Sequence, residues 1–299
     1  MTDPLRLIIN TQSRRGRAQL STAVHALKVN GVEVDLLAAT SPAESDAALR
    51  AAVERGAASV IVGGGDGTLS HAAQVLAHTG TALGVLPLGT GNTFARSVGV
   101  PLDLAGAARV IAAGHRTRID VGRVNGRAFL NSAAMGVSAH IAQALTPELK
   151  RRMGLLAWPL VGFQVLRSHQ ALQLELQLPQ EQRRVRTHQL LVANGRYVAG
   201  PLVAAPDASV QDHRLDVLAL GGNRLRSLLR AGLGWATLGS DRSQSTLRLE
   251  TQRLCVINQN GPTAVSVDGE IIEAARLDLS VEPRALWVLV PPGFDPQTV

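Results

Sequence analysis

A strand that runs into a glycine turn and then into a helix constrains the fold of this chain more than any other feature. In "SVIVGGGDGTLSHAAQVL", residues 59–76, an apolar run leads into Gly63–Thr68, and an apolar-periodic helix follows. Backbone N–H groups and the positive end of the helix dipole meet at such a turn, which favours an anion such as phosphate.

A second turn of the same kind follows the strand-like run "ALGVLPL". It begins "GTGNTFAR" at Gly89 and leads into another helix-like segment. The first turn alone is also compatible with a tight bend in which Asp66 and Thr68 only cap a helix. In a parallel sheet, however, both turns lie at the carboxyl ends of strands, where ligands bind. We therefore expect the two turns to form one phosphate pocket.

The glycine spacing excludes the two common nucleotide fingerprints. A dinucleotide fingerprint requires glycine at the first, third and sixth positions, and the sixth position counted from Gly63 is Thr68. A Walker motif requires Gly-Lys-Ser/Thr, which occurs nowhere in the chain. The pocket is thus expected to hold phosphate in another way.

The hydrophobic periodicity changes near the middle of the chain. From Leu5 to Val121, strand-like runs alternate with Ala-rich helix-like segments, which predicts an α/β domain with a mostly parallel sheet. After about Arg123, runs such as "ALQLELQL" alternate strictly, which predicts an antiparallel β-sandwich. We expect domains at residues 1–122 and 123–299. The last strand, at about residues 285–291, has no pattern that assigns it to either domain, so its return to the first stays an alternative.

Composition limits the compartment and the partners. The 299 residues include one cysteine and no Cys/His cluster with zinc spacing, and "MTDPLRLIIN" lacks the features of a signal peptide. We expect a cytoplasmic protein without a membrane span. The net charge of +7 suits an anionic partner, but an aromatic content of only 3% argues against nucleic acid.

The order of the motifs is similar to that of a known family. "GGGDGTL" and "PLGTGNTFAR", with "NTQSRRG" upstream, resemble the diacylglycerol kinase-like lipid kinases, the group that also holds sphingosine kinases and bacterial lipid kinases. "LNSAAMGVSAHIAQAL", "APDASVQDHRLDVLAL" and "VSVDGEII" extend the resemblance into the second half. The resemblance covers nearly the whole chain. It implies a Rossmann-like nucleotide-binding domain followed by a β-sandwich lipid domain.

The resemblance also implies an activity. It is an ATP- and Mg²⁺-dependent transfer of the γ-phosphoryl group to a lipid hydroxyl at a membrane surface, with diacylglycerol as the default acceptor. The nucleotide-binding positions that match the family are Asn10, Thr40, Gly64, Gly65, Asp66, Gly67, Thr68, Thr90, Gly91 and Asn92.

Three acids match catalytic positions of the family, namely Asp66, Asp268 and Glu270. Either of the last two can serve as the base toward the lipid hydroxyl, and the resemblance leaves that choice open. Asp212, with the backbone near Ser209 and Arg214, matches a structural magnesium site. Without the upstream motifs, the segment "VDGE" would be interpreted as an ordinary Asp-Gly hairpin turn.

The chain departs from the family at four positions. Thr93 replaces a frequent Asp, Ser70 and His71 replace Asn-Glu, and His213 replaces Gly. Thr93 puts in doubt a metal or substrate contact, and His213 puts in doubt the turn at the structural metal. The departures indicate either a different substrate or a weakened activity.

Other interpretations stay open at this point. Residues 150–167, "KRRMGLLAWPLVGFQVLR", suit either docking at an anionic membrane surface or a buried helix. An NAD kinase shares the "GGDGT" element but not the "PLGTGN" block. A nucleotide- or lipid-binding regulator that has lost turnover is the non-enzymatic alternative, and a homodimer is an alternative to a monomer.

Overall fold

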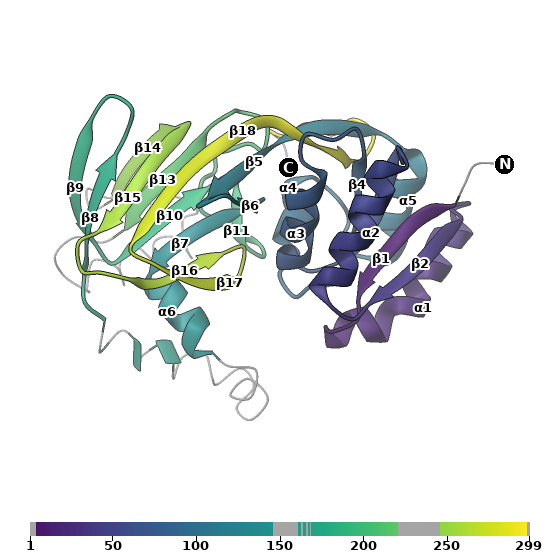
Figure 1. Ribbon diagram of the computed structural model, residues 1–299, viewed down its shortest axis with the longest axis horizontal. Helices are drawn as coiled ribbons and strands as arrows, with labels where there is room; N and C mark the ends of the chain where they lie inside the picture. Colours follow the sequence, from purple (N-terminus) through teal and green to yellow (C-terminus); the bar gives the residue numbers. More distant parts are fainter. Residues whose placement is uncertain are drawn as a thin grey trace.

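The computed structural model describes residues 4–145, 161, 162, 164, 165, 167, 169–220 and 246–297. Most of the segment 150–167, for which we weighed membrane docking against a buried helix, lies outside these residues. Within them, two regions rich in different elements lie side by side, joined by strands that arch from one to the other (Figure 1).

The first region is an α/β domain. Its parallel strands follow the order β2-β1-β3-β4. Its elements are β1 (Leu5–Asn10), α1 (Arg14–Val29), β2 (Val34–Ala39), α2 (Pro42–Glu54), β3 (Ser59–Gly64), α3 (Asp66–Leu76), β4 (Ala82–Pro87), α4 (Thr93–Ser97) and α5 (Leu104–Ala113). Helix α1 packs beside α5, and α2 packs beside α3. The chain moves from β1 to one edge of the sheet at β2 and then back across β1 to β3 and β4. Right-handed crossovers therefore place the pair α1 and α5 on one face of the sheet and the pair α2 and α3 on the other.

Local sequence explains where these helices begin. Ser13 accepts a hydrogen bond from the N–H of Gly16 at the start of α1, and Ser41 accepts one from Glu44 at the start of α2. Such caps satisfy N–H groups that have no partner within the helix. Strands β3 and β4 are almost wholly buried and β1 is buried at its middle, as expected for strands covered on both faces.

The second region is an antiparallel β domain. One sheet has the order β14-β13-β10-β7-β16-β17, and β15, β8 and β9 face it from the other sheet. Its elements are β6 (Arg127–Phe129), β7 (Ser132–Gly136), α6 (Val137–Ala144), β8 (Leu172–Gln177), β9 (Gln182–Thr187), β10 (Gln189–Ala193), β11 (Tyr197–Ala199), β12 (Leu202–Val203), β13 (Leu215–Leu220), β14 (Thr246–Thr251), β15 (Arg253–Asn258), β16 (Thr263–Val267) and β17 (Glu270–Ala274). Leu172, Leu174 and Leu176 are buried on one face of β8, so the predicted alternation is confirmed.

Two long strands connect the regions. They are β5 (Arg116–Val124) and β18 (Arg276–Leu289), which pair with each other and arch across the top of the molecule (Figure 1). The first part of β18 pairs with β15, and Val288 near its end pairs in parallel with Leu83 of β4. Both strands therefore belong to a sheet that runs through both regions.

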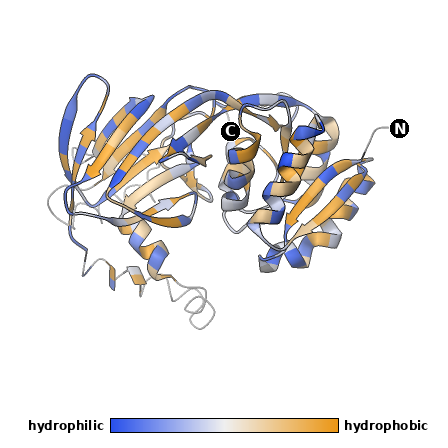
Figure 2. Cartoon of the chain, viewed as in Figure 1, coloured by the Kyte–Doolittle hydropathy of each residue, from blue (hydrophilic) through white to orange (hydrophobic). Residues whose placement is uncertain are grey.

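The predicted fold class is confirmed, because a mostly parallel α/β sheet is followed by an antiparallel β domain. The strands of both sheets are largely hydrophobic, whereas β9 at the far edge is hydrophilic (Figure 2). In the part of the chain that the structure describes, no helix is long and apolar enough to cross a membrane.

Candidate functional site

The two glycine turns touch each other through their main chains. A Cβ atom placed on Gly89 would lie 2.6 Å from the Cα of Gly65, and one placed on Gly65 would lie 3.2 Å from the Cα of Gly89. A Cβ on Gly64 would come within 2.5 Å of the Cβ of Thr68. A side chain at Gly64 or Gly89 would force the turns to shift, and one at Gly65 would be tight. The turns after β3 and β4 therefore form one cradle of bare backbone next to the start of α3.

Asp66 begins α3 and lies between the two turns. Its Oδ1 accepts hydrogen bonds from the N–H of Phe94, at 2.9 Å, and from Nδ2 of Asn131, at 3.3 Å. Its Oδ2 faces the second turn, 3.3 Å from where a Cβ of Gly91 would lie. One oxygen thus fixes the carboxylate, while the other points toward the cradle.

Asn10, at the end of β1, orients Thr68. The Nδ2 of Asn10 donates to Oγ1 of Thr68 at 3.2 Å. Because this oxygen is already an acceptor, the hydroxyl hydrogen of Thr68 stays available for an acceptor in the cradle. The structure therefore brings Asn10, Thr68 and both turns together.

Three other predicted nucleotide positions have different surroundings. Asn92 is buried and folds its own turn, since its Oδ1 accepts from the N–H of Gly89 at 2.7 Å and its Nδ2 donates to the carbonyl of Pro87 at 3.4 Å. Thr40 is exposed, and its hydroxyl donates to Glu44 at 3.0 Å. Thr90 is exposed. Asn92 thus shapes the cradle, and the hydroxyl of Thr40 is engaged at the start of α2.

Asp268 projects from the turn between β16 and β17 into a closed shell of donors. Its Oδ1 accepts from the N–H groups of Asn131 and Ser132 at 3.0 and 2.9 Å. Its Oδ2 accepts from the N–H of Leu130 at 2.6 Å and from the hydroxyl of Ser70 at 2.5 Å. The four bonds match the four lone pairs of a carboxylate. Burial raises the pKa of Asp268 to about 6, and the hydrogen bonds from Ser70, Leu130 and Ser132 oppose the rise.

Glu270 is more open and lies against the first glycine turn. Its Oε1 is 3.1 Å from where a Cβ of Gly67 would lie. Its Oε2 accepts from the guanidinium of Arg127 at 2.6 Å, and the Nε2 of His71 is 3.9 Å from Oε1. The side chain of Glu270 is 42% exposed. This acid from the β domain therefore extends over the cradle of the α/β domain.

The structure accounts for two of the departures from the family. Thr93 is buried, and its Oγ1 accepts from the N–H of Gly200 at 2.9 Å, which ties the start of α4 to the segment after β11. Ser70, on α3, holds Asp268. Both residues thus link the two domains at the site.

Three further residues at the site were missed by the sequence interpretation. Arg15 donates to the carbonyl of Gly89 at 2.7 Å, and it lies within the quoted motif "NTQSRRG", so the motif carried a signal for it. Asn131 likewise lies within the quoted segment "LNSAAMGVSAHIAQAL". Arg127 carried no signal, because its contact with Glu270 depends on how the two domains pack.

The three residues matched to a structural metal lie together in one turn. The Oδ2 of Asp212 accepts from the N–H of Ser209 at 2.9 Å, and its Oδ1 accepts from the N–H of Arg214 at 3.0 Å. Burial is the main cause that raises the pKa of Asp212. Among the described residues, no group of three or more His, Cys, Asp or Glu side chains is arranged to hold a metal ion.

Two family models match this chain and leave only its junction and its ends uncovered. Residues 4–124 match the diacylglycerol kinase catalytic domain. Residues 131–290 match the YegS C-terminal NAD kinase beta sandwich-like domain. The break between the two models falls at β6, where β5 leads into the second domain.

Relatives match over nearly the whole chain. A protein of Pseudomonas aeruginosa named "Probable lipid kinase YegS-like" is 32% identical, covering 96% of this chain and 94% of that protein. One of the same name from Klebsiella pneumoniae is 27% identical over 97% of each chain. A crystal structure described as a diacylglycerol kinase of Bacillus anthracis is 20% identical, with a TM-score of 0.77 and coverage of 98% and 99%. That structure has the same fold.

Proposed function

The chain belongs to the lipid kinase family that joins a diacylglycerol kinase catalytic domain to a YegS-type C-terminal domain, and we propose that it transfers the γ-phosphoryl group of Mg-ATP to a lipid hydroxyl. The observation that carries this proposal is the contact between Gly65 and Gly89 beside Asp66, with Glu270 extending over it from the second domain. Phosphoryl transfer needs positioning and charge stabilisation, and this arrangement offers both.

The nucleotide phosphates are placed against the two glycine turns, whose backbone stays bare because a Cβ on Gly64 or Gly89 would collide with Thr68 or Gly65. In the proposal, main-chain N–H groups of the two turns and the free hydroxyl hydrogen of Thr68 donate to phosphate oxygens. The guanidinium of Arg15, held at the carbonyl of Gly89, adds positive charge at the second turn. Bound Mg-ATP supplies the phosphoryl group, with the cation neutralising charge on its oxygens. The Oδ2 of Asp66, which faces the second turn, would help to hold that cation.

We assign proton removal from the lipid hydroxyl to Glu270. A general base must first be within reach of the proton it removes. Glu270 is half-exposed beside Gly67, whereas Asp268 is 8% exposed and has its four lone pairs filled. In this assignment, Asp268 holds the corner formed by Leu130–Ser132 against α3, which keeps Asn131 on Asp66.

Diacylglycerol is the default acceptor, with phosphatidic acid as its product. The proposal places the reaction at the membrane surface, which the protein visits from the cytoplasm. The names of the relatives, which refer to lipid kinases, and the net charge of +7 support it.

A labelled-phosphate assay tests the proposal. Purified protein is given labelled Mg-ATP and mixed micelles of diacylglycerol, monoacylglycerol, phosphatidylglycerol, ceramide or sphingosine, with NAD in a separate tube. A chloroform-extractable labelled product supports the proposal and identifies the acceptor class. Label found only in NADP would assign the chain to NAD kinase chemistry, and ATP binding without any product would favour a regulator.

A further inference from the structure

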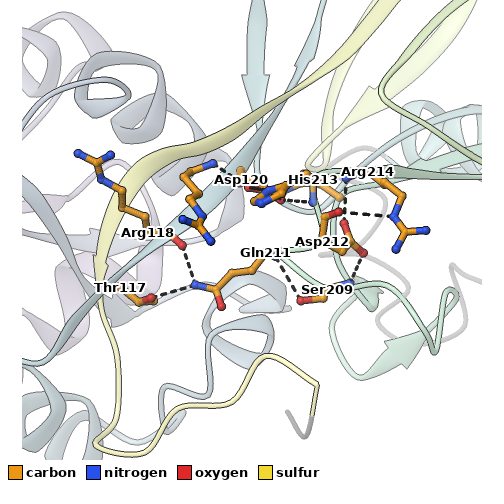
Figure 3. A network of polar contacts seen from close by, with 10 residues as sticks. Thr117, Arg118, Asp120, Ser209, Gln211, Asp212, His213 and Arg214 are labelled. Carbon is orange, nitrogen blue, oxygen red and sulfur yellow. Dashed lines mark hydrogen bonds and ion pairs between the residues drawn. The ribbon is translucent and has the colours of Figure 1, made fainter.

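The turn that the family implies to be a magnesium site is closed by the chain's own groups. It spans Ser209 to Arg214 and lies against β5, as Figure 3 shows. The carboxylate of Asp212 accepts one N–H on each oxygen, from Ser209 and Arg214. The carbonyl of Ser209, an oxygen that would be a metal ligand, instead accepts the N–H of Asp212 at 3.3 Å.

A second carboxylate beside this turn, Asp120 of β5, is wholly buried. It accepts from the backbone N–H of His213 at 2.7 Å and from the N–H of Arg284 at 2.7 Å. The ring Nδ1 of His213 lies 3.0 Å from its Oδ1 and 3.2 Å from its Oδ2. Both oxygens of Asp120 thus accept hydrogen bonds from N–H donors, and the imidazole of His213 lies next to the carboxylate (Figure 3).

The position of His213 in the turn makes this contact possible. Its φ is +63°, a left-handed conformation that favours glycine and costs free energy for a residue with a side chain. A glycine there would adopt the conformation without cost, but it would bring no imidazole to Asp120. The cost of the left-handed backbone at His213 is therefore accompanied by a gain, since the imidazole becomes a partner for the buried carboxylate of Asp120.

The donor set does not suit a hard divalent cation. Mg²⁺ takes six oxygen ligands in near-octahedral geometry, of which several are usually waters, so a protein site must offer it one or two carboxylates with open oxygens. Here the carboxylates of Asp212 and Asp120 already accept hydrogen bonds from backbone N–H groups. The imidazole of His213 adds a ring nitrogen beside Asp120. The residues present therefore do not fit the implied metal.

We propose that this turn is held without a metal ion, and that His213 joins it to Asp120 in the role the family gives to magnesium. The Nδ1–H and main-chain N–H of His213 connect the turn to β5, while the N–H of Arg284 connects β18 to the same carboxylate. Strands β5 and β18 join the two domains, so the contact fixes the turn to the strands between them.

The test uses the full chain without nucleotide, so that magnesium bound to ATP plays no part. Thermal unfolding is followed in EDTA and in MgCl₂, and metal content is measured on protein purified without chelator. The inference predicts the same Tm in both solutions and no metal carried by the protein. A stoichiometric metal, or a Tm that falls in EDTA and recovers with Mg²⁺, would overturn it. These results do not depend on kinase activity.

A matched pair of variants tests the role of the imidazole. His213→Ala keeps a side chain at a positive φ but removes the ring from Asp120. His78→Ala is the control, since His78 also has a positive φ, +62°, and its ring contacts an acid, Glu282, at 3.0 Å on an exposed surface. We expect His213→Ala to lower the Tm by about 3 °C or more, equally with and without Mg²⁺, because a buried acceptor loses its donor. His78→Ala should change it little. Equal effects of the two variants would contradict the inference.

Discussion

The hydroxyl oxygen of Ser70 lies 2.5 Å from Oδ2 of Asp268, which joins helix α3 of the first domain to the β16–β17 turn of the second. The same oxygen is 3.0 Å from the carbonyl of Asp66. A serine hydroxyl has only one hydrogen for these two acceptors. The protonation state of Asp268 is therefore coupled through Ser70 to Asp66, the residue that begins α3.

Ser70→Ala should shift the titration of Asp268 toward higher pH. Burial raises the pKa of this carboxyl to about 6, and the Ser70 hydroxyl opposes the rise. Without that hydroxyl, we expect the pKa to rise by about one further pH unit, since a hydrogen bond to a charged group is worth more than one to a neutral group. Carboxyl NMR of the variant and the parent measures the shift.

Ser97→Ala is the control for this change. Ser97 is also buried, and its hydroxyl donates at 3.2 Å to the carbonyl of Thr93, four residues earlier. Within the described part of the chain its hydroxyl bonds to no acid. Ser97→Ala should leave the pKa of Asp268 unchanged. An unshifted titration in Ser70→Ala would show that the two residues are not coupled.

The contribution of Asp268 to the stability of the protein should fall as the pH rises from about 4 to above 6. The pKa of Asp268 is about 6 in the folded protein, against an ordinary value of 3.8. In that window the folded state binds more protons than the unfolded state, so stability present at low pH is lost as the carboxyl ionises. The loss from this group is on the order of 3 kcal/mol. Asp268→Asn does not titrate, and the difference between its Tm–pH curve and the parent's isolates the effect. Parallel curves would contradict the prediction.

Gly89→Ala should damage the nucleotide site. The new Cβ would lie 2.6 Å from the Cα of Gly65, so the two turns must move apart. We expect a loss of about 1–3 kcal/mol in stability and a weaker affinity for Mg-ATP. Calorimetric titration measures the affinity. Gly80→Ala is the control, because a Cβ there meets nothing within 4 Å. Normal ATP binding by Gly89→Ala would exclude the proposed cradle.

Glu270→Gln should reduce phosphoryl transfer and leave ATP binding and stability nearly unchanged. The amide keeps the size of the side chain but cannot accept the proton, so a decrease on the order of 10²–10⁴-fold in kcat is expected. The kcat for transfer to the lipid checks this. Glu273→Gln, an exposed acid on the same strand, should retain full activity. Normal turnover by Glu270→Gln would return the role of base to Asp268.

The local sequence pattern was sufficient to predict the helices and strands and the two glycine turns. Each strand–turn–helix unit is encoded within about 20 residues, and parallel pairing brings the carboxyl ends of β3 and β4 together. Alternation likewise predicted the buried face of β8. These features depend on neighbours in sequence, so the sequence carries them directly.

The sequence could not predict contacts between residues that lie far apart along the chain. Ser70 meets Asp268 across 198 positions, and Arg127 meets Glu270 across 143. Neither pair has a spacing that marks it. Asn92 shows a different limit, because an amide in a glycine turn can bind a ligand or fold the turn, and only its bonds to Gly89 and Pro87 indicate the second role.

The departure at His213 shows why a substitution cannot be judged from one position. Replacement of glycine in a left-handed turn suggests damage to the turn. The compensating residue, Asp120, is 93 positions away on β5, and its burial is visible only in the fold.

Transfer of labelled γ-phosphate from Mg-ATP to diacylglycerol in mixed micelles is the direct test of the proposed lipid kinase activity. The parent protein and Asp66→Ala are compared at equal concentration. We expect labelled phosphatidic acid with the parent and none with Asp66→Ala, which lacks the carboxylate at the start of α3. Equal product from both proteins, or label in NADP and in no lipid, would contradict it.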